Sequence, residues 1–135
     1  AFNDAGCIKC HVVAGKGAKF GPELSDVSRR LKGPKLLEQI LKPSAEIHKD
    51  FYTHVFAMDD GTVISGLVIK DKSGVIHVLP NPLRPEEVKV LRKSNIEVHR
   101  KSKVSIMPEG LLDTFKRDEL LDLLLFVQSG GRARE

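Results

Sequence analysis

The chain has 135 residues, of which 41% are hydrophobic and 30% are charged, and its formal net charge is +4. This length suits one domain, or one domain with a modest insert. The longest apolar run, Leu120 to Val127, is interrupted by Asp122 and falls far short of the roughly 18 residues of a membrane span. Because the charge is small and no aromatic side chains accompany the basic runs, no nucleic-acid partner is expected.

The first third of the chain is predicted to consist of short helices and loops. Residues 3–13 are expected to form a short helix that begins at the N-cap Asn3 and carries both cysteines. Glycines and a proline predict a loop over residues 15–22. Two more helical segments are expected over residues 26–32 and 34–41.

The middle of the chain, from about residue 50 to residue 103, is predicted to be a small antiparallel β module. Its runs are short and β-branched, and Asp60-Gly61 and Ser73-Gly74 are typical hairpin turns. The expected strands cover residues 51–58, 62–69, 75–79, 87–91 and 95–99.

A last helix is predicted over residues 115–128. Its apolar face is expected to hold three residues and to be widened by Leu121 and Leu125; the three are Leu120, Leu124 and Val127. Lys116 and Arg117 are a poor start for a helix, so Thr114 is a candidate cap. Gly130 is expected just after the C-terminal end.

The motif that carries chemistry is Cys7-Ile8-Lys9-Cys10-His11, which has the pattern C-x-x-C-H. On a helix, positions i, i+3 and i+4 share one face. Two thiols on one side can therefore reach the two vinyl groups of a single haem, and the adjacent histidine lies under the iron. The spacing predicts covalent attachment of one haem c.

Two other interpretations of the cysteine pair are less favourable. A zinc site needs four ligands, and the chain has no second cysteine pair. A thioredoxin-like redox pair belongs beside a βαβ unit, which the pattern does not predict.

His11 is then the proximal iron ligand, and its second ring nitrogen needs a hydrogen-bond partner that fixes the ring. The loop 20–24 follows at short range and is a candidate source of a carbonyl, or it is a simple turn. The sixth ligand stays open at this point. Pro108 biases Met107 toward an extended backbone that can aim its thioether into a pocket, although a methionine in such a place is more often a core filler. His48 and His54 are the alternative ligands. Met58 and three of the four remaining histidines, His48, His54, His77 and His99, lie in or beside predicted strands, where surface or half-buried positions are usual.

The chain resembles class I c-type cytochromes, and specifically the haem-binding domain family of planctomycete and verrucomicrobial proteins. The resemblance covers nearly the whole chain, including the hairpin at Asp60-Gly61 with Gly66. It rests on four segments: Gly6-Cys7-Ile8-Lys9-Cys10-His11, Gly21-Pro22-Glu23-Leu24, Leu41-Lys42-Pro43-Ser44 and Ser105-Ile106-Met107-Pro108-Glu109-Gly110-Leu111-Leu112.

The resemblance implies roles for individual residues. Met107 matches the distal axial ligand, so the implied iron ligands are His11 and Met107. Pro22 matches the residue whose carbonyl accepts the hydrogen bond of the proximal histidine, and Leu24 matches a residue packed on the haem. Phe126 of the last helix is implied to contact the Gly6 region. Proteins of this family are exported, which implies an extracytoplasmic, soluble protein in the periplasm or an equivalent compartment.

The expected fold class is therefore α+β: a class I cytochrome c helical core in one domain, residues 1–135, with the β-rich insert 50–103 between the haem motif and the axial methionine. The expected function is one-electron transfer by a monohaem, non-enzymatic carrier. Its partners are expected to be redox proteins with acidic docking surfaces. The alternative is a haem enzyme, or a gas or redox sensor, whose sixth ligand dissociates. The role of the insert and the oligomeric state stay open.

Overall fold

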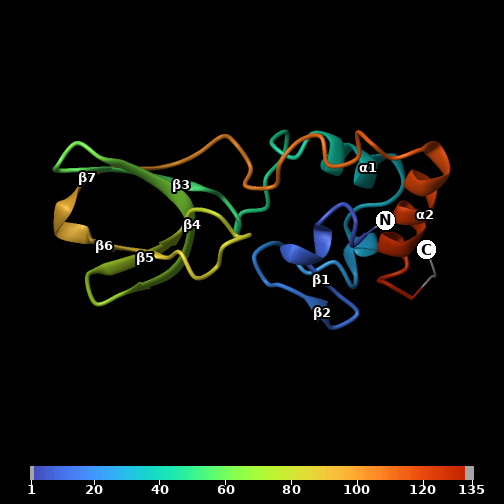
Figure 1. The fold of residues 1–135 in the computed structure, drawn as a ribbon, viewed down its shortest axis with the longest axis horizontal. Coiled ribbons are helices and arrows are strands. Elements are labelled where there is room, and N and C mark those ends of the chain that lie inside the picture. The colour runs from blue at the N-terminus through green and yellow to red at the C-terminus, as the bar shows by residue number, and fades with distance from the viewer. Residues whose placement is uncertain (1, 133–135) are drawn as a thin grey trace. The chain divides into compact units, whose positions relative to one another are not determined.

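The structure is a computed structural model that describes residues 2–132. The chain divides into two compact units, one formed by residues 1–46 with 107–135 and the other by residues 47–106. We call these the helical unit and the β unit and describe each by itself. Helices and strands occur together, so the fold is mixed α+β (Figure 1).

The helical unit is built from two α-helices and several short elements. Its elements are the 3₁₀ turn η1 (Cys7–Lys9), the strands β1 (Val12–Val13) and β2 (Lys16–Gly17), the 3₁₀ turn η2 (Val27–Arg29), and the helices α1 (Pro34–Leu41) and α2 (Arg117–Gln128). The sequence-based bounds of α1 are confirmed, and proline stands at its start, where its missing N–H costs nothing. The Gln128 side chain accepts the Gly33 N–H at 2.8 Å, which ties the start of α1 to the end of α2.

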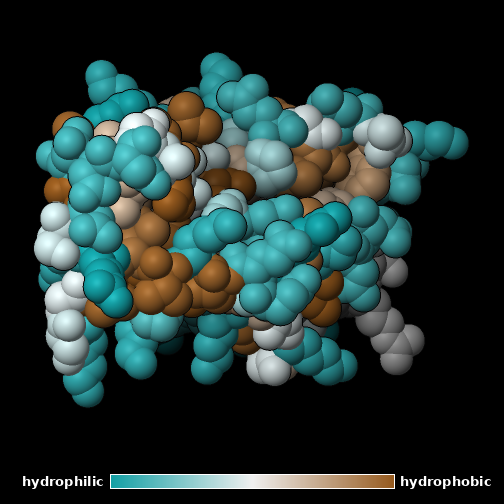
Figure 2. Space-filling view, turned by 60° about the vertical axis from the view of Figure 1, so that its left-hand side comes forward, coloured by the Kyte–Doolittle hydropathy of each residue, from teal (hydrophilic) through white to brown (hydrophobic). Residues whose placement is uncertain are grey.

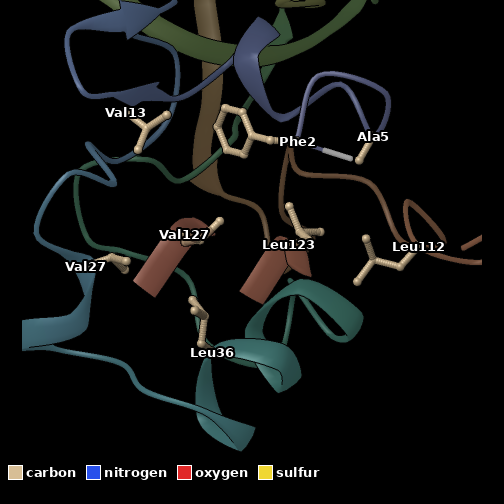
Figure 3. Close-up of a cluster of buried hydrophobic side chains, with 8 residues drawn as sticks. All are labelled: Phe2, Ala5, Val13, Val27, Leu36, Leu112, Leu123 and Val127. Atoms are coloured by element: carbon tan, nitrogen blue, oxygen red, sulfur yellow. The ribbon is translucent and has the colours of Figure 1, made fainter. Parts of the chain in front are cut away.

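The core of the helical unit joins residues from both ends of the chain. The cluster in Figure 3 consists of eight buried side chains, namely Phe2, Ala5, Val13, Val27, Leu36, Leu112, Leu123 and Val127. The Phe2 ring lies 5.2 Å from the ring of Phe126, centroid to centroid. Burial of such apolar surface supplies most of the stability of a small unit, at about 25 cal/mol per Å².

The predicted helix over 3–13 is wrong. Only Cys7–Lys9 forms a helical turn, of the 3₁₀ type, and Val12 already pairs with Gly17 in a two-stranded ladder. Gly6 has φ +82°, a left-handed conformation that an α-helix does not contain, so the chain turns before the cysteines and Asn3 caps no helix there. The segment predicted over 26–32 likewise shrinks to the turn η2.

The last helix is confirmed with a shorter start, and the predicted apolar face of Leu120, Leu124 and Val127 packs on the core of the helical unit. Its buried residues are Leu123 and Val127, while Leu121 and Leu125 are exposed, so the expectation that these two widen the apolar face is wrong. Leu123 widens the face instead, so the core contact follows the spacing i, i+3, i+4 and i+7 from Leu120.

The start of α2 is capped without Thr114. Lys116 is the N-cap residue, and its N–H donates to the Glu119 carboxylate at 2.9 Å. Asp118 and Glu119 lie in the first turn, where negative charge favours the helix dipole. Gly130, with φ +68°, ends the helix as expected, and a Cβ there would lie 2.1 Å from the Ser25 carbonyl oxygen.

The β unit is one antiparallel sheet with the strand order β6-β5-β4-β3-β7 (Figure 1). Three of the four connections are short, the connection over residues 80–88 is longer, and the last strand pairs with the first. The strands are β3 (His54–Met58), β4 (Val63–Lys72), β5 (Val75–Leu79), β6 (Lys89–Arg92) and β7 (Ile96–Lys101), with the 3₁₀ turn η3 (Lys93–Asn95) before β7. The five predicted strands are confirmed, and β5 has the predicted bounds.

Alternation of side chains gives the β unit its own core. The buried residues at its centre are Phe56, Met58, Ile76, Val78 and Leu91. Ser73 and Gly74 both have positive φ, +58° and +77°, as a two-residue hairpin turn of type I′ requires. Some apolar side chains stay outside this core, among them Val63 at 67% exposure, and Figure 2 shows hydrophobic residues at the surface among hydrophilic ones.

Candidate functional site

The C-x-x-C-H motif folds into one tight turn. The N–H groups of Cys10 and His11 both donate to the Cys7 carbonyl oxygen, at 3.1 and 2.9 Å. The five residues of the motif therefore fold around a 3₁₀ turn and not as part of the α-helix that we predicted. Both cysteines are half-buried, and no disulfide joins them.

The following loop is fastened to the motif by backbone hydrogen bonds. The Cys10 carbonyl oxygen accepts two N–H groups, from Phe20 at 3.0 Å and from Gly21 at 2.7 Å, and the Ile8 carbonyl accepts the N–H of Ala18 at 3.1 Å. The chain therefore passes through the β1–β2 hairpin and returns against the motif. This return brings the next residue, Pro22, beside His11.

His11 is held by the Pro22 carbonyl. Its Nδ1 lies 2.7 Å from the Pro22 oxygen, and because a carbonyl only accepts, Nδ1 carries the proton in this bond. Nε2 then has the lone pair and is the ring nitrogen available to a metal. Burial lowers the pKa of His11, against smaller opposing effects of the Pro22 hydrogen bond and the Glu23 carboxylate, and so favours the neutral ring that binds metals.

Gly21 makes room for the His11 ring. A Cβ at Gly21 would lie 2.8 Å from Cε1, 3.0 Å from Nδ1 and 3.2 Å from Nε2 of the ring. The backbone of Gly21 cannot easily withdraw, because its N–H is bonded to Cys10. Gly21 is therefore a positioning residue for His11. In the sequence it was visible only as a glycine in a predicted loop and as the first residue of one of the segments that carry the resemblance.

Substituting Gly21→Ala is expected to displace the His11 ring and weaken its bond to Pro22. Overpacking of this kind costs about 1–3 kcal/mol in the free energy of unfolding, which denaturant titration measures. The optical spectrum of the haem-loaded protein should change as well, because the ring orientation changes. Gly15→Ala is the control: its φ of +77° makes it strained, but nothing lies within 4 Å, so the spectrum should stay unchanged. An unaltered spectrum in Gly21→Ala would contradict the positioning role.

The residues of the turn fit a covalently held haem. The two thiols are reduced cysteines on one turn, His11 presents one bonded and one available nitrogen, and Gly21 leaves space beside the ring. Burial raises the pKa of Cys10, with a smaller opposing effect of Lys9, so this thiol stays protonated near neutral pH rather than acting as a reactive thiolate.

Leu24, which the resemblance implies to pack on the haem, lies in a partly buried, apolar position. It is half-buried and packs against the core of the helical unit, and its N–H donates to the Val12 carbonyl at 2.8 Å. This hydrogen bond fixes the backbone of Leu24 close to the motif, from where its side chain is expected to contact the haem.

Met107 lies in the loop between β7 and α2, as predicted, and belongs to the same compact unit as His11. Its side chain is half-buried. The other methionine, Met58, is buried in the core of the β unit, where it packs as a core residue.

The other histidines lie in the β unit, and three of them make a hydrogen bond there. His48 accepts the N–H of Asp50 at 3.1 Å, and His54 lies 2.9 Å from His99, nitrogen to nitrogen. His77 is half-buried in β5. None of residues 2–132 forms a cluster of three histidine, cysteine, aspartate or glutamate side chains able to hold a metal ion.

One comparison with known proteins gave a family match. A family model described as Cytochrome c matches residues 1–64. The match, which covers less than half of the chain, supports a c-type cytochrome, that is, a haem-binding electron-transfer protein. A comparison with curated proteins found no significant match. Within the described range 2–132, no helix has the length and hydropathy to cross a bilayer.

Proposed function

We propose that the protein is a monohaem one-electron carrier in which Cys7 and Cys10 hold the haem covalently and His11 and Met107 are the axial iron ligands. The observation that carries this proposal is the bond between His11 Nδ1 and the Pro22 oxygen, because it leaves Nε2 for the iron and fixes the ring. When bound, the haem supplies a reversible one-electron couple. The rest of the protein then has to hold the haem and to bind the redox partner.

The arrangement supports the class I type of helical core and the planctomycete-type family as finer assignments. The segments in question are the motif turn, the Pro22 carbonyl and the loop that ends at Met107. Two axial ligands leave no open iron position, so an electron carrier is favoured over an enzyme. Since haem c is attached outside the cytoplasm, we also propose an extracytoplasmic location.

Three lysines beside the motif make a docking surface for an acidic redox partner. Lys9 lies within the motif, while Lys16 and Lys19 belong to the hairpin and loop that return against it. All three are exposed, and no ion pair joins them to an acid within residues 2–132. Unneutralised charges of one sign raise the local potential and accelerate encounter with a partner of opposite charge.

Electron transfer to an acidic redox protein should slow steeply as salt is raised, because the Debye length falls to about 8 Å at physiological ionic strength. Stopped-flow rates across a salt series measure this. Charge reversal at Lys9, Lys16 and Lys19 together should flatten the dependence.

The matched control is a second triple reversal on the β unit, at the exposed residues Lys70, Lys72 and Lys89. It changes the net charge equally but should leave the salt dependence close to that of the unmodified protein. If the control variant flattens the dependence and the first variant does not, docking occurs on the β unit. A rate that does not respond to salt would contradict electrostatic docking altogether.

A further inference from the structure

Two histidines meet on one face of the sheet in the β unit, and the haem proposal uses neither. In the pairing of β3 with β7, His99 stands opposite Phe56 and Lys101 stands opposite His54, so the two histidines are diagonal neighbours. Nδ1 of His54 lies 2.9 Å from Nε2 of His99, and the ring centroids are 5.1 Å apart.

The ring of Phe56 holds both imidazoles. Phe56 is fully buried in the core of the β unit. His99 stacks on it at 4.4 Å between centroids and 27° between planes, and His54 lies nearly parallel to it at 6.2 Å and 16°. Side chains whose orientation is locked by packing are the ones that present ligands with little loss of freedom.

We propose that His54 and His99 form a binding site for a divalent transition metal of tetragonal coordination, copper(II) above all. Two nitrogens that are 2.9 Å apart, each about 2.0–2.1 Å from one ion, subtend an angle of about 90° at it. That is the angle between neighbouring ligands of copper(II) or nickel(II). Imidazole nitrogen is a good ligand for these metals, and the affinity of such a site rises through nickel(II) to copper(II) and is lower for zinc.

The hydrogen bond between the rings is compatible with this site. One inner nitrogen carries a proton while no metal is bound. In the metal-binding form that proton resides on the outer nitrogen of the same ring, so both rings stay neutral and both inner nitrogens present a lone pair. No third histidine, cysteine, aspartate or glutamate joins the pair within residues 2–132, so water or an external ligand fills the other positions.

The charge beside the pair limits the affinity. Lys101 stands opposite His54, and its ammonium lies 5.0 Å from the centre of the Tyr52 ring, in a cation–π contact. Burial, then His99 and Lys101, lowers the pKa of His54, which favours the neutral ring at pH 7. The same ammonium repels an arriving cation, so removing it should tighten binding.

The test is a titration of the haem-loaded full chain with copper(II) sulfate, followed by calorimetry and electron paramagnetic resonance. We expect one copper per chain with hyperfine splitting from two nitrogens. His54→Gln and His99→Gln should each weaken binding about 10-fold or more. Glutamine can still hydrogen-bond the remaining imidazole, so each variant removes a ligand without removing the contact between strands. His77→Gln on β5 is the control and should bind as the unmodified protein does, while Lys101→Gln should bind a few-fold more tightly.

Equal copper affinity in the unmodified protein and in the double variant His54→Gln/His99→Gln would overturn the site, as would the absence of stoichiometric binding. The haem content of every sample is measured separately from its absorption. Failure of the haem proposal and failure of this site are therefore distinguishable.

Discussion

Replacing both Cys7 and Cys10 by alanine is expected to abolish covalent haem attachment completely. The two thiols are the only cysteines in the chain, and the motif turn presents them beside His11. Acid-acetone extraction should remove all haem from the double variant, whose intact mass then equals that of the polypeptide. The unmodified protein should retain one haem, as a pyridine haemochrome assay would count it.

The single variants Cys7→Ala and Cys10→Ala should each keep one thioether bond and a shifted haemochrome band. Lys9→Ala, an exposed change within the same motif, is the control and should leave attachment intact. Haem that is extracted freely from the unmodified protein would contradict the covalent assignment. Two haems per chain would contradict the monohaem assignment.

The sequence predicted correctly those helices and strands whose ends are determined by a few neighbouring residues. Proline at the start of α1 and a type I′ turn before β5 are decided by a few residues, and both elements have the predicted bounds. The helix over 3–13 failed because its periodicity competed with two stronger constraints. Gly6 adopts a left-handed conformation, and the Cys10 carbonyl is occupied by N–H groups from residues 20 and 21 instead of a helical partner.

In the candidate site, too, the features set by neighbouring residues were predictable from the sequence, and those set by residues distant in the sequence were not. The identity of His11 as a metal ligand follows from five consecutive residues. The role of Gly21 depends on a distance between its missing Cβ and a ring ten positions earlier, which no spacing reveals. The pairing of His54 with His99 depends on strand register, and the register of β3 with β7 shifts between Ala57 and Met58. Alternation alone therefore could not bring these two residues together.

Met107→Ala is expected to open the sixth position of the iron. Loss of a thioether ligand should lower the reduction potential by on the order of 0.1 V, well inside the roughly 0.8 V range that axial ligands set. The reduced variant should bind carbon monoxide, and the weak far-red sulfur-to-iron band of the oxidised form should vanish. Optical titration and potentiometry measure all three effects.

Met58→Leu provides the matched control for the Met107 variant, because Met58 is buried in the core of the β unit. A volume-conserving change there should cost less than about 1.5 kcal/mol and leave the haem spectrum unaltered. If Met107→Ala leaves spectrum and potential unchanged, another residue is the ligand, and His48→Gln and His54→Gln test two alternative ligands. If the unmodified reduced protein already binds carbon monoxide, its sixth position opens without mutation. The haem enzyme or gas sensor would then replace the electron carrier, because a carrier needs both ligands to stay in place in both oxidation states.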